Sequence, residues 1–255
     1  MARVLITGSN DGLGRDAARR LVDAGHEVTG HARNQAKAEG LRAELPGLAD
    51  VLVADLGSLR QVRELAAAAN AGGAFDAVIH NAGVYLEPSR VATMDGHSHV
   101  LTVNALAPYV LTARMHRPQR LVYLTSGLHQ RASADLDDID WRRRPWNAMD
   151  AYAESKLYLV ALAAAVARRW PDVRANSVSP GWVATKMGGP RATDDLAAGS
   201  LTQAWLAVSD DPGAQVSGAF LFHQQVRPAH PAATDPAFQD ALLGALERLT
   251  GDALP

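Results

Sequence analysis

A tyrosine and a lysine, Tyr152 and Lys156, stand four residues apart at the start of the most apolar helical stretch of the chain. Side chains at this spacing share one face of an α-helix, so both can reach one ligand. A free phenol titrates at about pH 10, but a neighbouring ammonium stabilises the phenolate and lowers its pKa. The pair therefore predicts a general acid/base acting on a substrate oxygen, although this spacing alone is also common on ordinary helix surfaces.

A glycine-rich turn joins the first predicted strand to the first predicted helix. Its residues are Thr7, Gly8, Ser9, Asn10, Asp11, Gly12, Leu13 and Gly14. Glycine permits a tight turn at Gly8, close approach of a pyrophosphate at Gly12 and close helix packing at Gly14. The helix would direct its free N–H groups at the phosphates. The spacing T-G-x-x-x-G-x-G differs from G-x-G-x-x-G, yet it favours a nucleotide site over a plain strand–helix connection.

The second predicted strand ends in His31-Ala32-Arg33-Asn34, where the type of nucleotide is decided. A carboxylate at this distance from the glycines would hold a ribose 2′-hydroxyl, whereas an arginine accommodates a 2′-phosphate. The guanidinium of Arg33 matches a phosphate in charge and shape, and we expect the adjacent Asn34 to contact the cofactor as well. We therefore expect NADP(H) in preference to NAD(H), with an ordinary surface arginine as the other explanation.

The composition favours small-molecule chemistry. The 255 residues are 47% hydrophobic, and we expect a single domain over residues 1–255. A net charge of −2 provides no field that would attract nucleic acid or anionic lipid. The absence of cysteine removes disulfides, thiolate catalysis and cysteine-ligated metals.

Targeting and metal signals are weak. The N-terminus predicts no signal peptide, and the longest apolar run, Leu157 to Ala167, is about half the length of a membrane span. None of the nine histidines falls in a ligand pattern such as H-E-x-x-H, although His97 and His99 are two residues apart. We expect a cytoplasmic protein with no membrane span and no metal.

Short apolar runs alternate with longer helical patterns through most of the chain. This alternation predicts an α/β fold with a doubly wound, Rossmann-like sheet of seven parallel strands and helices on both faces. The candidate strands are Arg3–Thr7, Glu27–His31, Asp50–Ala54, Ala77–His80, Arg120–Thr125, Arg174–Val178 and Ala219–Phe222. The candidate helices are Leu13–Ala24, Gln35–Glu44, Leu59–Ala69, a stretch around Asp95–Met115, Ala151–Trp170, Asp194–Val208 and Ala237–Leu249.

Two segments lack periodicity. Residues Gly127 to Asp150 are expected to form a loop whose charges are solvated. Those charges are Asp135, Asp137, Asp138, Asp140 and the run Arg142-Arg143-Arg144. The proline-rich segment Val226 to Pro236 predicts a second loop.

The order of these motifs resembles the short, single-domain type of the short-chain dehydrogenase/reductase superfamily over nearly the whole chain. The matching residues are Thr7–Gly14, Asp55-Leu56, Asn81-Ala82-Gly83, Asn104, Ser126, Tyr152 with Lys156, and Pro180-Gly181 through Thr185. The resemblance implies a hydride-transferring oxidoreductase that interconverts a carbonyl and an alcohol. In such a reaction the cofactor supplies the hydride, while the protein supplies orientation, a proton and electrostatic stabilisation.

The resemblance also implies roles at the reacting centre. Ser126 would hydrogen-bond the substrate oxygen, and Tyr152 would be the acid in reduction and the base in oxidation. Lys156 would bind the nicotinamide ribose and lower the tyrosine pKa. Asn104 would hold a water that links the lysine to solvent.

Further positions are implied to bind the cofactor. Asp55 and Leu56 match residues that contact adenine, and Asn81, Ala82 and Gly83 match a strand end beside the adenosine ribose. In the segment Pro180-Gly181-Trp182-Val183-Ala184-Thr185, the Val183 backbone and the Thr185 hydroxyl would hold the carboxamide.

A narrower likeness points to the retinol-dehydrogenase and WW-domain-oxidoreductase branch. It rests on residues 31–34, the long gap between Ser126 and Tyr152, and the C-terminal pattern from Pro228 to Gly251. It suggests a lipophilic ketone, aldehyde or alcohol as substrate. Two departures are His80, where the family often has a second Asn, and a short stretch between Asn104 and Arg120.

Apolar side chains follow several strand ends, where open α/β sheets bind ligands. They are Tyr85, Met94, Trp141, Trp146, Met149, Trp182 and Met187, and each could equally be local packing. As a group they suggest an apolar or aromatic substrate. The helix Ala151–Trp170 is apolar on all sides, so we expect a homodimer or homotetramer that covers its outer face.

Two other functions remain open. A redox-sensing nucleotide binder without catalysis should lack part of the Tyr, Lys, Ser and Asn set, and all four are present. A sugar-nucleotide epimerase or dehydratase would carry T-G-x-x-G-x-x-G and a longer C-terminal substrate domain, and this chain has neither.

Overall fold

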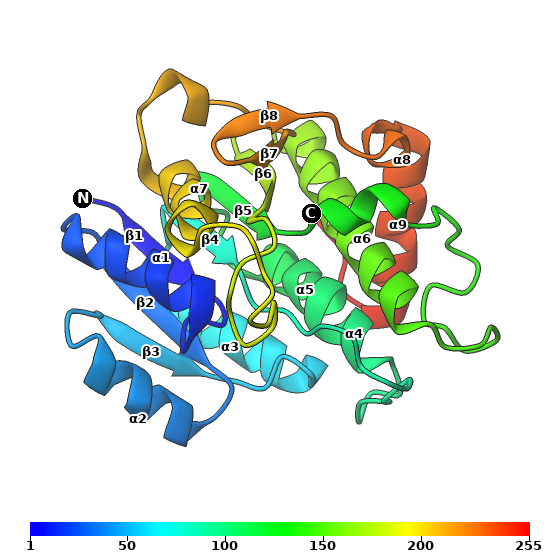
Figure 1. Ribbon diagram of the computed structural model, residues 1–255, viewed down its shortest axis with the longest axis horizontal. Helices are drawn as coiled ribbons and strands as arrows, with labels where there is room; N and C mark the ends of the chain where they lie inside the picture. The colour runs from blue at the N-terminus through cyan, green and yellow to red at the C-terminus, as the bar shows by residue number, and fades with distance from the viewer.

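The strands of the chain form one twisted sheet, and the computed structural model describes residues 1–255. Their order across the sheet is β3-β2-β1-β4-β5-β6-β7-β8 (Figure 1). The strands are β1 (Arg3–Ile6), β2 (Glu27–Ala32), β3 (Asp50–Val53), β4 (Ala77–His80), β5 (Arg120–Leu124), β6 (Arg174–Ser179), β7 (Phe220–Phe222) and β8 (Gln225–Arg227). The pairs from β3 to β7 are all parallel, which confirms the predicted doubly wound sheet.

The eighth strand was not predicted. β8 pairs antiparallel with β7 through a two-residue turn at His223 and Gln224. Both turn residues have positive φ values, 46° and 61°, and such turns usually contain glycine. Without a glycine, and with Pro228 directly after the strand, the sequence predicted only a loop here.

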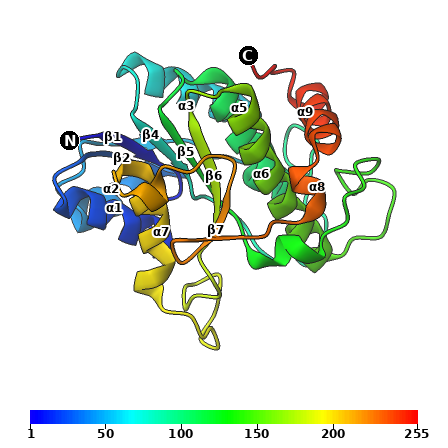
Figure 2. The same cartoon turned by 90° about the horizontal axis from the view of Figure 1, so that it is seen from above.

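Helices cover both faces of the sheet, as expected (Figure 2). One face carries α1 (Gly12–Asp23), α2 (Gln35–Glu44) and α7 (Leu196–Val208), and the other carries α3 (Leu59–Ala71), α5 (Ala107–Arg114) and α6 (Ala148–Arg169). The remaining helical elements are the longer helix α9 (Pro236–Thr250) and several short ones. The short ones are α4 (His99–Leu101), the π-helix Thr102–Leu106, the 3-10 turns Gly127–Arg131 and Pro212–Ala214, and α8 (Pro231–Thr234). None of these helices has the length and hydrophobicity that crossing a bilayer requires.

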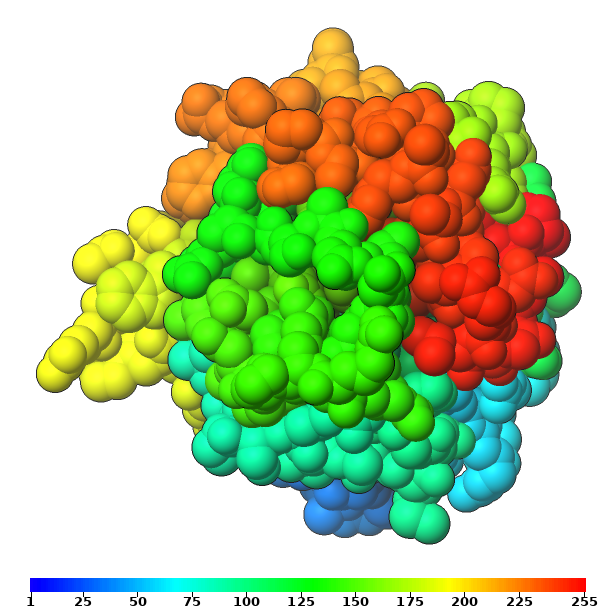
Figure 3. All heavy atoms as spheres, turned by 90° about the vertical axis from the view of Figure 1, so that its right-hand side faces the viewer, coloured from blue at the N-terminus to red at the C-terminus, as the bar shows by residue number.

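Helix α6 is buried within its own chain, and this corrects the reasoning behind our oligomer prediction. Leu157, Tyr158, Leu159 and Leu162 are all almost completely buried. Helices α8 and α9 form an additional layer outside α6 (Figure 2), and Figure 3 shows these orange and red elements beside the green segment that leads into α6. The apolar circumference of α6 therefore needs no second subunit.

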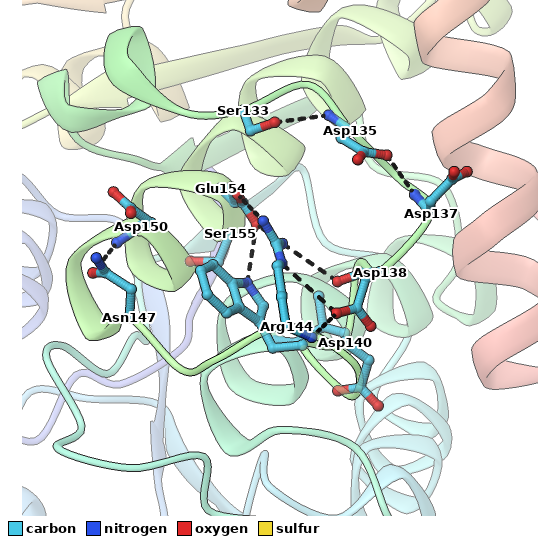
Figure 4. Close-up of polar contacts among 12 residues, drawn as sticks. Ser133, Asp135, Asp137, Asp138, Asp140, Arg144, Asn147, Asp150, Glu154 and Ser155 are labelled. Carbon is cyan, nitrogen blue, oxygen red and sulfur yellow. Dashed lines mark hydrogen bonds and ion pairs between the residues drawn. The ribbon is translucent and has the colours of Figure 1, made fainter.

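The charges between residues 127 and 150 are not simply solvated, contrary to our expectation. Both carboxylate oxygens of Asp138 accept hydrogen bonds from the backbone N–H groups of Arg142, Arg143 and Arg144. Arg144 also pairs with the buried Glu154 of α6, with Nη1 2.9 Å from Oε1 (Figure 4). Asp135, Asp137, Arg142 and Arg143 remain solvent-exposed, whereas Asp138, Asp140 and Arg144 are partly or fully buried.

A second anchor of the same segment is Asp140, which is 4% exposed. Its carboxylate accepts hydrogen bonds from the Ser98 backbone N–H and from Arg142, and it contacts His97 at 3.2 Å. Burial of a carboxylate is tolerated when donors surround it. These donors hold the pKa of Asp140 at about 2, against the opposing effect of its burial.

Candidate active site

The carboxyl ends of β1, β4, β5 and β6 surround a cleft of about 1250 Å³. Parallel strands bring their C-terminal residues to one edge of the sheet, where open α/β folds bind ligands. The predicted site residues that line the cleft are Gly8, Asn10, Gly12, Leu13, Gly14, Arg33, Asp55, Leu56, Asn81, Ala82, Gly83, Ser126, Tyr152, Lys156, Pro180, Gly181, Val183 and Thr185. Asn34 and Asn104 do not line it.

The glycine turn packs against the end of β4. Gly8 has φ +64°, and a Cβ added there would lie 2.8 Å from the Cα of Ala82. The side-chain amide of Asn81 donates to the carbonyl oxygens of Thr7 (2.9 Å) and Gly8 (3.1 Å). A Cβ at Gly14 would collide with that amide and with the Gly8 carbonyl. The turn thus keeps its shape only with glycine at these places.

His31 also holds the glycine turn, a role that sequence reasoning missed. The Gly8 N–H donates to His31 Nδ1 (3.0 Å), and Nε2 contacts the Ala54 carbonyl at 3.0 Å. A carbonyl only accepts, so Nε2 carries the proton and the ring is neutral. Desolvation lowers the pKa of His31 to about 4, which keeps it neutral at physiological pH. The position of His31 near the end of β2, the strand that pairs with β1 beside the glycine turn, is the signal that could have revealed this role.

Two cations lie where β2 leads into α2. The exposed Arg33 lines the cleft together with Lys37 of α2, which sequence reasoning missed. Asn34 has a different task, because its side chain accepts a hydrogen bond from the Lys37 backbone N–H and caps α2. The predicted contact of Asn34 with cofactor therefore finds no support in the lining of the cleft.

The segment after β6, from Pro180 to Gly188, contributes most of its residues to the cleft wall. A Cβ at Gly12 would lie 3.5 Å from the Thr185 methyl group, so this segment reaches the glycine turn. Thr185 Oγ1 accepts a hydrogen bond from the Gly188 N–H, and Lys186 Nζ lies 3.1 Å from Asp11 Oδ2. The segment thereby bridges the two halves of the cleft.

Ser126 lies two residues after β5 and caps the start of the 3-10 turn Gly127–Arg131. Its Oγ accepts a hydrogen bond from the Leu128 backbone N–H at 3.2 Å. With this lone pair engaged, the hydroxyl proton remains available for donation. Ser126 and Tyr152 both line the cleft, and the Ser126 side chain lowers the pKa of the Tyr152 phenol.

The pKa of Tyr152 differs from our expectation. Burial raises it above the usual value of a phenol, and the hydrogen bond with Ser126 opposes only part of that rise. Lys156 lies near, with Nζ 5.6 Å from the centre of the tyrosine ring. Desolvation is the largest cause, because a buried phenolate loses its hydration. Tyr152 is consequently held in its protonated form, which can donate.

Lys156 projects from α6 into the cleft beside Tyr152. Its Nζ donates to the Leu124 carbonyl (3.0 Å), and its own backbone carbonyl accepts from Thr125 Oγ1 (3.0 Å). An ammonium has three donors, so the remaining N–H groups are free for a ligand. Desolvation lowers the pKa of Lys156 to about 8. A Cβ at Gly83 would lie 3.3 Å from this nitrogen, so glycine leaves the approach open.

Asn104 lies behind the cleft wall in the π-helical turn, and it is completely buried. Its Nδ2 donates to the Val84 carbonyl (3.1 Å) and to Ser155 Oγ (3.0 Å), and its Oδ1 accepts from the Val84 N–H (2.8 Å). Such π-helical insertions are frequent at functional sites. Asn104 connects the segment after β4 to α6, the helix that carries Tyr152.

The far end of the cleft is apolar. Of the seven side chains proposed to line it, Tyr85, Met149, Trp182 and Met187 do so, joined by Leu128, Phe220 and Phe222. Tyr85 packs edge-on against Tyr152, with ring centres 4.6 Å apart. Trp141 and Trp146 instead donate their indole N–H groups to Glu154 and to the Glu87 carbonyl, and Met94 is fully exposed.

The residues fit a nicotinamide dinucleotide. The glycine turn cannot accept a Cβ at Gly8 or Gly14, helix α1 begins at Gly12 on the cleft wall, and a buried ammonium with free donors lies beside a protonated phenol. The class of protein defined by this fold and cleft is a Rossmann-type oxidoreductase.

Comparisons with known proteins give the family. Residues 8–208 match a family model described as Enoyl-(Acyl carrier protein) reductase. The chain is 43% identical to the short-chain dehydrogenase chyC of Penicillium rubens, covering 100% of both chains. It is 31% identical to human retinol dehydrogenase 13, covering 72% of this chain and 60% of that protein. The chain belongs to the short-chain dehydrogenase/reductase family and is an oxidoreductase acting on CH–OH and C=O groups with a nicotinamide cofactor.

Solved structures agree with this assignment. An uncharacterized protein from Mycobacterium paratuberculosis matches with a TM-score of 0.88 at 27% identity, covering 100% of this chain and 95% of that one. A blue fluorescent protein from a metagenomic library, solved in complex with NADPH, matches with a TM-score of 0.71 at 25% identity, covering 87% and 95%. The retinol-dehydrogenase likeness is thus real, although that protein is a more distant relative than the fungal dehydrogenase.

Proposed function

We propose that this protein is an NADP(H)-dependent carbonyl reductase or alcohol dehydrogenase for an apolar or aromatic small molecule, with Tyr152 as the proton donor and acceptor. The observation that carries the proposal is the convergence of Ser126, Tyr152 and Lys156 at one point of a cleft that joins a glycine turn to an apolar end.

The bound cofactor would supply or accept the hydride. In reduction, Ser126 and Tyr152 both donate hydrogen bonds to the substrate carbonyl oxygen, where negative charge develops. Tyr152 then transfers its proton to that oxygen, and its elevated pKa means that the phenol is fully protonated at neutral pH. Lys156 uses its free N–H groups to hold the ribose hydroxyls, and its charge stabilises the phenolate that remains.

Oxidation needs the reverse transfer, in which Tyr152 accepts the alcohol proton. The buried phenol resists ionisation, so additional positive charge beside it is required. Lys156 provides one positive charge, and the oxidised nicotinamide ring would provide another.

The remaining assignments follow the cleft. Gly8, Asn10, Gly12, Leu13 and Gly14 would bind the pyrophosphate, and Asp55, Leu56, Asn81, Ala82 and Gly83 the adenosine. Pro180, Gly181, Val183 and Thr185 would hold the carboxamide, and Asn104 would position the segment behind Lys156.

The preference for NADP(H) rests on Arg33 and Lys37. Arg33 follows β2 and Lys37 lies in the first turn of α2; both line the cleft, and neither forms a salt bridge within the chain. Two unneutralised cations suit a phosphate dianion on the adenosine ribose.

A screen of carbonyl compounds tests the function. Aryl and aliphatic ketones and aldehydes of increasing size are incubated with protein and NADPH, and NADPH absorbance is followed. We expect turnover of apolar or aromatic carbonyls and poor turnover of small charged ones. Absence of turnover across the panel, together with tight NADPH binding, would instead favour the second candidate, a nucleotide-binding redox sensor without catalysis.

The oligomeric state stays a prediction. The apolar helix that suggested a homodimer or homotetramer is covered by α8 and α9 of the same chain, so an oligomer would have to use another surface. Sedimentation at micromolar concentration distinguishes an oligomer from a monomer of 27.1 kDa.

A further inference from the structure

His129 is a fully buried histidine that the mechanism above does not use. It lies in the 3-10 turn that begins at the catalytic Ser126. A buried imidazole is costly unless both nitrogens have partners. Each nitrogen of His129 has one, and the two partners belong to different parts of the active site.

The first partner is the backbone of Ser126. His129 Nδ1 lies 2.7 Å from the Ser126 carbonyl oxygen, which also accepts the His129 backbone N–H at 3.1 Å. Since a carbonyl only accepts, Nδ1 carries the proton. The catalytic serine is therefore fixed by the ring that follows it three residues later.

The second partner lies on the wall of the substrate end. The His230 backbone N–H donates to His129 Nε2 at 3.3 Å, which is consistent with a neutral ring protonated on Nδ1. The neighbouring Gln130 donates from Nε2 to the Pro228 carbonyl at 2.7 Å. His129 and Gln130 thus hold the two ends of the segment Pro228–His230.

That segment borders the substrate end of the cleft. Pro228 and Gln130 both line the cleft, as does Phe220 of β7. The Phe220 ring packs edge-on against the His129 ring, with centres 4.5 Å apart. His129 consequently contacts the reacting centre on one side and two parts of the apolar wall on the other.

We infer that His129 is a positioning residue that sets the Pro228–His230 wall relative to Ser126, and that Gln130 determines substrate selectivity through the same wall. This inference rests on the proposed function, because it assigns the apolar end to the substrate. The His129 Nδ1 bond maintains the position of Ser126 and hence the rate, whereas the His129 Nε2 and Gln130 bonds maintain the wall and hence the fit of the substrate.

Two substitutions separate the two nitrogens. In His129→Asn, the amide nitrogen stands at the same number of bonds from Cβ as Nδ1, so the bond to Ser126 can be kept while the bond to His230 is lost. In His129→Gln, the amide oxygen stands where Nε2 does, so the His230 bond can be kept while the Ser126 bond is lost. Gln130→Ala removes the second wall contact alone.

The assay measures kcat and KM with NADPH for acetophenone and for benzophenone, a smaller and a bulkier aryl ketone. We expect His129→Gln to lower kcat about three- to tenfold for both, the effect of one buried hydrogen bond, with little change in KM. His129→Asn and Gln130→Ala should keep kcat within about twofold and change the KM ratio of the two ketones about three- to tenfold.

Amide hydrogen exchange provides a readout that does not depend on activity. The His230 N–H should exchange faster in His129→Asn than in the wild type, and at the wild-type rate in His129→Gln. Equal effects of the two variants on kcat, KM and exchange would overturn the inference, as would unchanged values in both. If the wild type reduces neither ketone nor any other carbonyl, the proposed function fails, while the exchange rates still decide whether His129 holds the wall.

Discussion

Replacing Gly14 by alanine should disrupt the cofactor cleft through one methyl group. The new Cβ would stand 2.5 Å from the Gly8 carbonyl oxygen and would collide with the Asn81 side-chain amide. That amide cannot simply rotate away, because it donates to the Thr7 and Gly8 carbonyls. Overpacking costs about 1–3 kcal/mol, and each lost hydrogen bond adds about 1 kcal/mol.

The combined cost is about 2–5 kcal/mol, which for a chain of this size lowers Tm by roughly 4–20 °C. Because the displaced turn is the proposed pyrophosphate site, Kd for NADPH should rise at least about tenfold. Calorimetry and fluorescence titration measure the two quantities.

Gly40→Ala is the matched control. Gly40 lies in the exposed part of α2, and a Cβ there meets nothing within 4 Å. Alanine should stabilise the helix by about 0.5–1 kcal/mol and leave NADPH binding unchanged. The reasoning is refuted if Gly14→Ala keeps the wild-type Tm and Kd, or if the control loses as much as Gly14→Ala does.

Three further substitutions test other parts of the account. Arg33→Asp should shift the ratio of kcat/KM for NADPH over NADH by at least about tenfold towards NADH, and an unchanged ratio would disprove the role of Arg33. Lys156 loses its proton as pH rises through about 8, so the NADPH affinity of the wild type should fall above that pH. Lys156→Met should bind NADPH weakly at every pH, and a fall in its affinity near pH 8 would exclude Lys156 as the cause of the wild-type decrease. Arg144→Ala leaves Glu154 buried without its cation and should lower stability by about 3 kcal/mol in denaturant titration, whereas a loss below about 1 kcal/mol would show that the pair is unimportant.

The sequence was sufficient for the parallel sheet and for most of the cleft. Strands such as Ala77–His80 are short apolar runs with no competing helical pattern, and the glycine turn and the Tyr152–Lys156 spacing place the site at their carboxyl ends. These features are local, so periodicity and spacing reveal them.

The features that the sequence did not reveal depend on contacts between distant residues. Asp138 and Arg144 look like solvated charges until the fold brings Glu154 beside them, and α6 looks uncovered until α9 packs on it. His129 has no recognisable spacing to His230, which lies 101 residues further along the chain. The pKa of Tyr152 likewise depends on how deeply the folded protein buries the ring.

The central claim is that Tyr152 transfers the proton, and single-turnover reduction by the Tyr152→Phe variant tests it most directly. Phenylalanine keeps the ring and its packing against Tyr85 but removes the hydroxyl. We expect the variant to bind NADPH within about threefold of the wild-type affinity and to oxidise NADPH at least about a thousandfold more slowly on the best carbonyl substrate. A variant that binds NADPH normally and reduces that carbonyl at near the wild-type rate would contradict it.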